Sequence, residues 1–190
     1  MSTTISLFVQ DQDGEHTEID LDDVWIQSDV IDEESFHGAL VAKIATWALE
    51  RGSSFDDISG LTVDDDEGQE LEIHNETGEN RHSWILEVVQ LYMWLNCDKH
   101  YCEDEAILAR VDDIGWKWFD FDSDLQEAED MYSQEFDGDY AEYAREYMDG
   151  CGESLSEWAE KYFDYEEYGE DLVDGYDRVS WGSREFLFSQ

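Results

Sequence analysis

Two short stretches of the chain contain the residue types that could hold a metal ion. In the first, Asp120, Asp122 and Asp124 place carboxylates at alternate positions, as the first three ligands of an EF-hand calcium loop do. That loop also needs a glycine at its sixth position and a glutamate at its twelfth, where this chain has Leu125 and Met131. With 52 Asp and Glu in 190 residues such a run arises by chance. We therefore expect loosely held divalent cations but no dedicated calcium site.

The second stretch is CDKHYC, in which Cys97, His100 and Cys102 lie close together. Zinc sites use these residue types, usually in paired C-x-x-C spacing and with a fourth ligand. Only His82 or Cys151 could complete such a set, so packed or surface thiols are the better interpretation. We predict no metal ligands and no cofactor. Three cysteines are also an odd number for a disulfide framework, which favours a reducing compartment.

No arrangement of residues indicates catalysis. The chain has no Ser-His-Asp signature, no Gly-rich phosphate loop and no H-E-x-x-H sequence. Carboxylate pairs occur in every window, and catalytic pairs are recognised by unlike environments that a sequence does not reveal. A nuclease would need basic residues to hold its polyanionic substrate, and ten Lys and Arg are too few. We expect a binding protein and no enzyme.

The net charge of −42 is the strongest signal in the sequence. It far exceeds the magnitude of about 2–8 that solubility requires of a small domain. Because 41% of the residues are hydrophobic, the chain should fold rather than remain a disordered acidic tail. Its complement is a strongly basic surface, and the commonest deep basic surfaces are nucleic-acid channels. We predict a partner that is a DNA-binding protein with a basic groove, and no direct binding of nucleic acid.

The amount of charge suits this interpretation. Duplex DNA carries one negative charge per ~1.7 Å of axis, so 42 charges correspond to about 20 base pairs. Negative charge also argues against binding to anionic lipid, and no apolar run approaches the ~18 residues of a membrane span. The first residues lack the basic and apolar regions of a signal peptide, so we expect a cytoplasmic protein.

The elements that must position these acids fall into three units. Residues 1–80 predict an α+β unit with strands at 5–10 and 17–26, a helix at 33–51, and a hairpin formed by 61–63 and 70–74. Residues 81–114 predict a central helical unit, with helices at 82–96 and 104–111. We expect residues 114–121 to be extended or a short turn.

Residues 115–190 predict acidic helices closed by a strand. From residue 124 a helical apolar stripe is formed by Tyr132, Phe136, Tyr140, Tyr143 and Tyr147, and Gly150 and Gly152 end it. Ser154 or Ser156 is expected to cap a further helix, whose inward stripe is Trp158, Tyr162, Tyr165 and Tyr168. The final residues SREFLFSQ predict a strand. The predicted fold class is α+β and elongated, with small antiparallel sheets, packed acidic helices and two to three small subdomains.

Acids three or four residues apart on a helix lie ~5–6 Å from each other, a spacing comparable to that of phosphates along DNA. Two such rows are predicted. One is Glu135, Asp139, Glu142 and Glu146, and the other is Glu160, Asp164, Glu167, Glu170 and Asp171.

The stretch SEWAEKYFDYEEYGEDLVDGYDRV, followed by EFLFSQ, resembles the C-terminus of the ArdA antirestriction proteins. Upstream, SQEFDGDYAEYAREYMDGCG is similar to the acidic helix of that family. The resemblance covers about residues 115–190. It implies an elongated α+β homodimer, carried by a phage, plasmid or other mobile element, that acts in the bacterial host cytoplasm. Such proteins mimic DNA, occupy the DNA-binding groove of type I restriction-modification enzymes and protect incoming DNA without catalysis.

The resemblance also implies which acids imitate phosphates. Those that match its sequence blocks are Asp137, Asp139, Glu142, Glu146, Asp164, Glu166 and Asp171. The charge argument extends the set to Asp120, Asp122, Asp124, Glu135, Glu160, Glu167 and Glu170.

Three alternatives remain open at this stage. An acidic DNA mimic could act on another target, such as a CRISPR effector, a different defence system or a histone-like protein. A halophile's cytosolic protein could carry this charge with no charged partner at all. A calcium-buffering or enzymatic role is the third.

Overall fold

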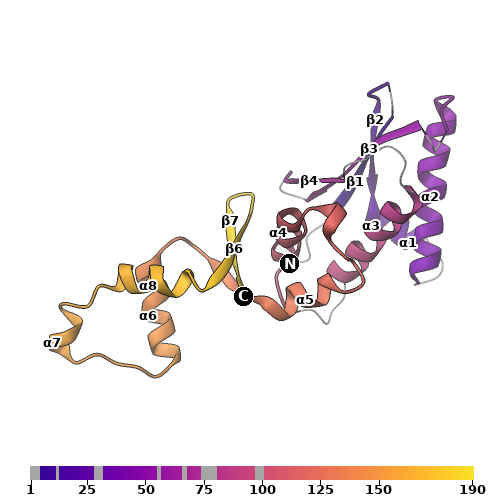
Figure 1. The fold of residues 1–190 in the computed structure, drawn as a ribbon. Helices are drawn as coiled ribbons and strands as arrows, with labels where there is room; N and C mark the ends of the chain where they lie inside the picture. Colours follow the sequence, from indigo (N-terminus) through magenta and orange to yellow (C-terminus); the bar gives the residue numbers. More distant parts are fainter. Residues whose placement is uncertain are drawn as a thin grey trace.

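The computed structural model describes residues 5–11, 13–27, 32–54, 57–65, 68–73, 81–96 and 101–190. Helices and two small antiparallel sheets build an elongated α+β fold (Figure 1), which confirms the predicted fold class. The long axis runs from helix α2 (Glu33–Glu50) at one end to helix α7 (Glu157–Glu160) at the other. Among the described helices, none combines the length and the apolar character needed to cross a membrane.

The first sheet has the strand order β2-β1-β3-β4 and is antiparallel throughout. Its strands are β1 (Ile5–Asp11), β2 (His16–Asp20), β3 (Ile58–Asp65) and β4 (Glu70–Ile73). Buried and exposed side chains alternate along β1, β3 and β4, because one face of the sheet meets the core. The predicted first strand and the β3–β4 hairpin are confirmed, except that His74 lies outside the described residues.

Three helices supply the core of this half of the molecule: α1 (Leu21–Gln27), α2 and α3 (Arg81–Leu95). The predicted helices at 33–51 and 82–96 are confirmed. The predicted strand at 17–26 is wrong in its second half, where α1 begins. Asp20 explains the change, because its carboxylate accepts hydrogen bonds from the backbone N–H groups of Asp22 and Asp23 and so caps the first turn.

The centre of the molecule is built from α4 (Asp104–Ile114), the 3₁₀ helix η2 (Trp116–Trp118) and α5 (Asp124–Met131). The predicted helix at 104–111 is confirmed and runs three residues further, until Gly115 turns the chain at a φ of 84°. The expected short turn at 114–121 is the 3₁₀ helix. Trp116, Phe119 and Phe121 are buried there, and the rings of Trp116 and Phe119 both pack against that of Phe121.

The second sheet has the order β5-β7-β6, with β5 (Tyr132–Phe136), β6 (Tyr176–Trp181) and β7 (Arg184–Ser189). The predicted final strand is confirmed as β7, which lies in the middle. Its Phe186 and Phe188 join the main core, whereas Leu187 points into a second, smaller core. Burial on both faces accounts for the apolar run FLF in so acidic a chain.

Helices α6 (Tyr140–Gly150) and α8 (Tyr165–Val173) pack on each other over the second core, with Phe136, Tyr143 and Val173 as buried members. The main core, in contrast, runs from the first sheet through α3, α4 and α5 to the second sheet. The division into units at residues 80 and 114 stays a prediction.

The continuous helical stripe expected from Tyr132 to Tyr147 is wrong in its first part. Tyr132 and Phe136 belong to a strand, because the segment pairs with β7 some fifty residues later. Only Tyr140, Tyr143 and Tyr147 share a helix, and that helix ends at Gly150 as expected.

The single helix expected through residues 158–168 is also wrong. Ser156 caps α7 as predicted, by accepting a hydrogen bond from the backbone N–H of Ala159. The helix then stops at Glu160, and α8 begins separately after Asp164. Trp158 and Tyr162 are 73% and 75% exposed, so neither is part of an inward stripe. Phe163 packs edge-on against Tyr165 and Tyr168.

Candidate partner-binding surface

Helix α6 presents acids on one face because its other face is buried. Asp139 is its N-cap and accepts a hydrogen bond of 2.8 Å from the backbone N–H of Glu142. We call α6, α8 and the second sheet the lobe. Tyr143, Ala144 and Met148 are buried in it. Glu142 and Glu146, one turn apart, are exposed. We call these two residues the α6 acidic pair.

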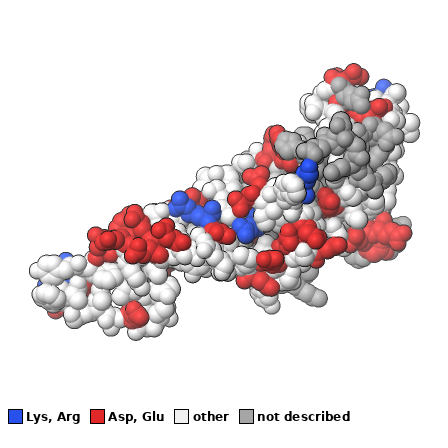
Figure 2. Space-filling view, in the orientation of Figure 1, with Lys and Arg blue, Asp and Glu red and all other residues white. Residues whose placement is uncertain are grey.

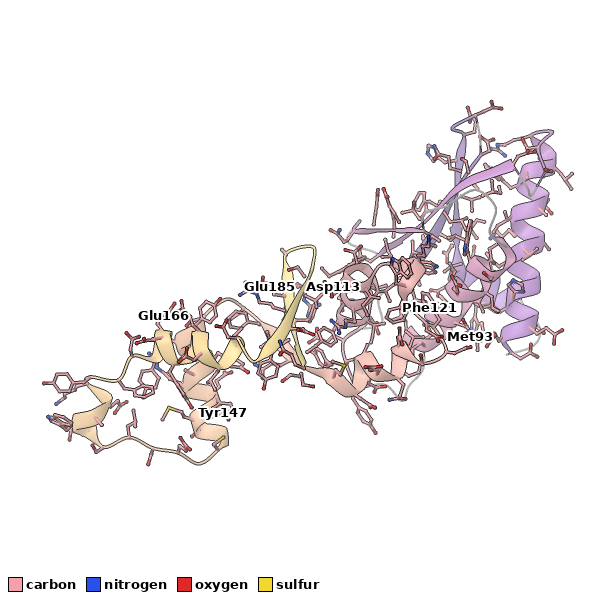
Figure 3. The ribbon with its side chains drawn as sticks, viewed as in Figure 1. Met93, Asp113, Phe121, Tyr147, Glu166 and Glu185 are labelled. Atoms are coloured by element: carbon pink, nitrogen blue, oxygen red, sulfur yellow. The ribbon has the colours of Figure 1, made fainter. Side chains whose placement is uncertain are left out.

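Helix α8 carries the denser group of acids. Its N-cap is Asp164, which accepts from the backbone N–H of Glu167 at 3.1 Å. Gly169 and Val173 are buried against α6 and the second sheet. The α8 acidic row is exposed and consists of Glu166, Glu167, Glu170 and Asp171. Acidic side chains gather over α8 in Figure 2, and Glu166 is labelled there on the ribbon in Figure 3.

Contacts between the helices fix where these acids stand. The face of α8 at Gly169 lies directly on the backbone of Tyr140 at the start of α6. The guanidinium of Arg145 on α6 lies 4.6 Å from the ring centre of Tyr165 on α8. Burial, followed by a hydrogen bond with Tyr176, raises the pKa of Tyr143, which stays neutral in the small core. Both helices are thereby anchored to each other and to the second sheet.

The basic residues of this half are used for internal contacts rather than to neutralise the helices. Arg184 on β7 donates two hydrogen bonds, of 2.7 and 2.8 Å, to the carboxylate of Glu135. It also forms ion pairs with Glu103 and Glu105 at the start of α4. Arg178 donates to the Tyr140 hydroxyl at 2.8 Å. Basic side chains accordingly gather over the β6–β7 hairpin, beside the acids of α8 (Figure 2).

The acids of the α8 row and the α6 pair are left without such partners. Across the described ranges, no Lys or Arg lies within ion-pair distance of any of the six carboxylates. Like charges at helical spacing cost a few tenths of a kcal/mol per pair. The buried aromatic and aliphatic side chains of the lobe offset that repulsion, at about 1.5–3 kcal/mol for each large one.

The structure does not bring all the predicted acids together. Glu135 lies on β5, and its bidentate pairing with Arg184 lowers its pKa and matches its charge, so we exclude it from the surface. Glu160 ends α7, apart from α8. Asp137, Asp139 and Asp164 are exposed but accept hydrogen bonds from nearby backbone N–H groups. They position the helices as well as adding charge.

Asp120, Asp122 and Asp124 lie away from α6 and α8, at the start of α5, where their carboxylates accept hydrogen bonds from nearby groups. Asp124 accepts from the backbone N–H of Asp120 at 2.9 Å, and Asp120 accepts from that of Asp122 at 3.1 Å. The Asp122 carboxylate accepts from the side-chain amide of Gln90 at 2.9 Å. The run forms the turn that precedes α5, and the hydrogen bond between Gln90 and Asp122 connects this turn to α3.

Sequence reasoning missed two acids that extend the rows. Asp149 is exposed on α6, three residues after Glu146, and Asp174 is exposed directly after α8, three residues after Asp171. The spacing of three and four that marked the other acids also marks these two. Continuing the same spacing by one more step in each row would have identified both residues from the sequence.

The described residues offer no group of three or more His, Cys, Asp or Glu side chains suited to a metal ion. Cys97 and His100 of the predicted zinc cluster lie outside the described residues, as does the side chain of His82. Cys102 is buried, which raises the pKa of its thiol to about 12, and Cys151 is exposed at the end of α6. These two cysteines therefore belong to different parts of the fold.

Comparisons of the chain with protein-family models, curated proteins and solved structures found no match, so the resemblance to the ArdA proteins rests on the residues that carry it.

Proposed function

We propose that this protein is a DNA mimic that inhibits a type I restriction-modification enzyme by occupying its DNA-binding groove. The observation that carries the proposal is the α8 acidic row, four exposed carboxylates within six residues that have no basic partner in the described chain. The net charge of −42 on an elongated body supports it, because a basic groove that binds duplex DNA is both long and strongly positive.

The remaining parts of the proposal follow from the resemblance to ArdA proteins. The protein would act as a homodimer in the cytoplasm of a bacterial host and protect the DNA of a mobile element, without catalysis. Binding through many separate charges works by electrostatic complementarity and is sensitive to salt. No single carboxylate is expected to dominate it.

The test is a competition experiment with purified protein, a type I restriction-modification enzyme and labelled target DNA. In ordinary salt, stoichiometric or slightly excess protein is expected to displace the DNA. DNA that stays bound in the presence of excess protein contradicts the proposal. Displacement from a different DNA-binding enzyme instead would retain mimicry and change the target.

A matched pair of variants locates the contact. The first replaces the α8 acidic row with E166Q, E167Q, E170Q and D171N. The second removes the same charge from exposed acids of α1 and α2, at the opposite end of the molecule, with D23N, E33Q, E34Q and E50Q. We expect the first to need at least about tenfold more protein for displacement and the second less than about threefold more, since complementary charges act mainly where they meet. Equal effects would remove α8 from the contact.

A further inference from the structure

A groove lies at the centre of the molecule, away from α6 and α8. It has a volume of about 1140 Å³ and runs between β4, the first turns of α3 and the 3₁₀ helix η2. Its floor includes the buried residues Leu71, Trp84 and Trp116. Trp116 is held in place by a hydrogen bond of 2.7 Å from its indole N–H to the carboxylate of Glu87. This hydrogen bond fixes the orientation of the Trp116 indole.

The rim of the groove is acidic. Glu70 and Glu72 stand on the exposed face of β4, Glu87 comes from α3 and Asp112 from the end of α4. Burial and the neighbouring Asp113 raise the pKa of Asp112, so a positive charge placed beside it would be favoured. Against these four carboxylates, the lining residues that the structure describes include one cation, Lys117.

Trp118 is the feature that most needs an explanation. It lines the groove and is 74% exposed, although an indole is among the side chains that gain most from burial. The ammonium of Lys117 lies 5.4 Å from its ring centre, which shows that a cation fits against this ring. An exposed indole above an acidic rim is suited to a planar cation that can stack on the ring and pair with carboxylates at the same time. Among protein side chains, arginine has this combination.

We propose that this groove binds an arginine-bearing segment of a partner protein, with a guanidinium stacked on Trp118 and paired with the carboxylates of the rim. Sites for small ligands occupy about 300–1,000 Å³. The groove is slightly larger than this range, so it can accommodate several residues of a peptide segment. The proposal does not rest on the proposed function: it concerns a different part of the surface, and the DNA competition experiment does not test it.

The probe is a capped peptide, Ac-Gly-Arg-Gly-Arg-Gly-amide, titrated into the full chain by calorimetry at 0.15 M salt. Its citrulline analogue has nearly the same shape without charge and is expected not to bind. Any cationic peptide is attracted to a protein of charge −42, so the variants must leave that charge unchanged. Trp118→Ala does so, and Trp158→Ala, 73% exposed on α7, is its matched control.

We expect Trp118→Ala to weaken binding of the arginine peptide about fivefold or more, as loss of a partly desolvated cation–π contact would. Trp158→Ala should stay within about twofold of the unmodified protein, and the thermal midpoints of both variants should be unchanged because both rings are exposed. Equal weakening by both variants, or by neither, overturns the proposal.

A second pair tests the rim. The double variant Glu70→Gln/Glu72→Gln is expected to weaken binding of the arginine peptide. The effect should exceed that of Glu33→Gln/Glu34→Gln on α2, although both variants remove two charges. A peptide with lysine in place of arginine should bind at least about twofold more weakly, since an ammonium does not stack or form paired hydrogen bonds. Equal binding of the two peptides, or equal loss in the two double variants, would mean general attraction and would also overturn the proposal.

Discussion

Gly169 lies so close to Tyr140 that a Cβ atom at position 169 would stand 2.0 Å from the carbonyl oxygen of Tyr140. The neighbouring atom belongs to the backbone at the start of α6, so it cannot turn aside as a flexible side chain would. This contact sets the distance between α6 and α8. The relative positions of the acids on the two helices therefore depend on Gly169, a residue that carries no charge.

Gly169→Ala is expected to force the two helices apart and to lower the free energy of unfolding by about 1–3 kcal/mol, the usual cost of overpacking. Urea unfolding monitored by tyrosine and tryptophan fluorescence measures it. Gly150→Ala is the control, because nothing lies within 4 Å of a Cβ at that position. An unfolding midpoint that Gly169→Ala leaves unchanged would contradict the close packing.

Arg184→Met is expected to destabilise the protein by about 1–3 kcal/mol at pH 7, between the values for exposed and buried ion pairs. The substitution leaves Glu103, Glu105 and Glu135 facing one another without their shared cation. The measurement is urea unfolding of both proteins. A difference below a few tenths of a kcal/mol would mean that Arg184 does not join β7 to α4 and β5.

The same variant has a predictable pH dependence. Arg184 holds the pKa of Glu135 below its ordinary value of 4.5, so the folded state binds this proton less tightly than the unfolded state does. The stabilisation is present above 4.5 and is lost as the pH falls through the lowered pKa. The stability difference between the unmodified protein and Arg184→Met should therefore shrink on acidification below pH 4.5. A difference that grows there would contradict this linkage.

Local patterns in the sequence predict the helices α2, α3 and α4 and the strands β1, β3, β4 and β7, whereas pairing across long distances is not visible in them. Tyr132 and Phe136 are spaced as a helical stripe would be, but the segment is a strand because β7 is available to pair with it. The break between α7 and α8 did have a local signal. Both α6 and α8 begin with Asp-Tyr-x-Glu, residues 139–142 and 164–167, in which the aspartate caps the helix.

The site divides along the same line. Which acids are exposed follows from helical spacing once a helix is placed correctly, as for Glu166, Glu170 and Asp171. Helical spacing does not show which acids lack a basic partner. Glu135, for example, is paired with Arg184, which lies 49 residues further along the chain. The groove beside Trp118 is lined by residues from four separate segments of the chain, and no local sequence pattern predicts that they lie together.

Trp181→Phe is expected to lower the free energy of unfolding by about 1–3 kcal/mol, because it leaves a buried carboxylate short of a donor. The indole N–H of Trp181 on β6 donates to Asp65 on β3 at 2.6 Å, across 116 residues of sequence. Trp47→Phe is a matched control, since the buried indole N–H of Trp47 has no hydrogen-bond partner among the described residues. Equal costs for the two variants would show that lost ring volume, and not the hydrogen bond, is responsible.

Asp64→Asn is expected to stabilise the protein at pH 7. Burial, together with Glu70, Asp65 and Glu18, raises the pKa of Asp64 above 3.8, so the folded state binds this proton more tightly than the unfolded state does. That contribution is complete below pH 3.8 and is lost as the pH rises through the raised value, so the ionised group is unfavourable at neutral pH.

Thermal melts at pH 7 and pH 3 measure this gain, which should be present at pH 7 and absent at pH 3. Burial is the larger cause, and salt does not screen burial. Most of the gain should therefore survive in 1 M salt. A gain that disappears in salt would assign the effect to repulsion among the four carboxylates, and a loss of stability at pH 7 would contradict the sign.

The central place of β7 in the second sheet imposes an order on how the chain folds as it is synthesised. Strands β5 and β6 are made first, but both pair with β7, which also contributes Leu187 to the core beneath α6 and α8. Until Ser189 has left the ribosome, the two acidic helices have like-charge repulsion and an incomplete core. We infer that α6, α8 and the core beneath them complete their packing only after β7 has been synthesised.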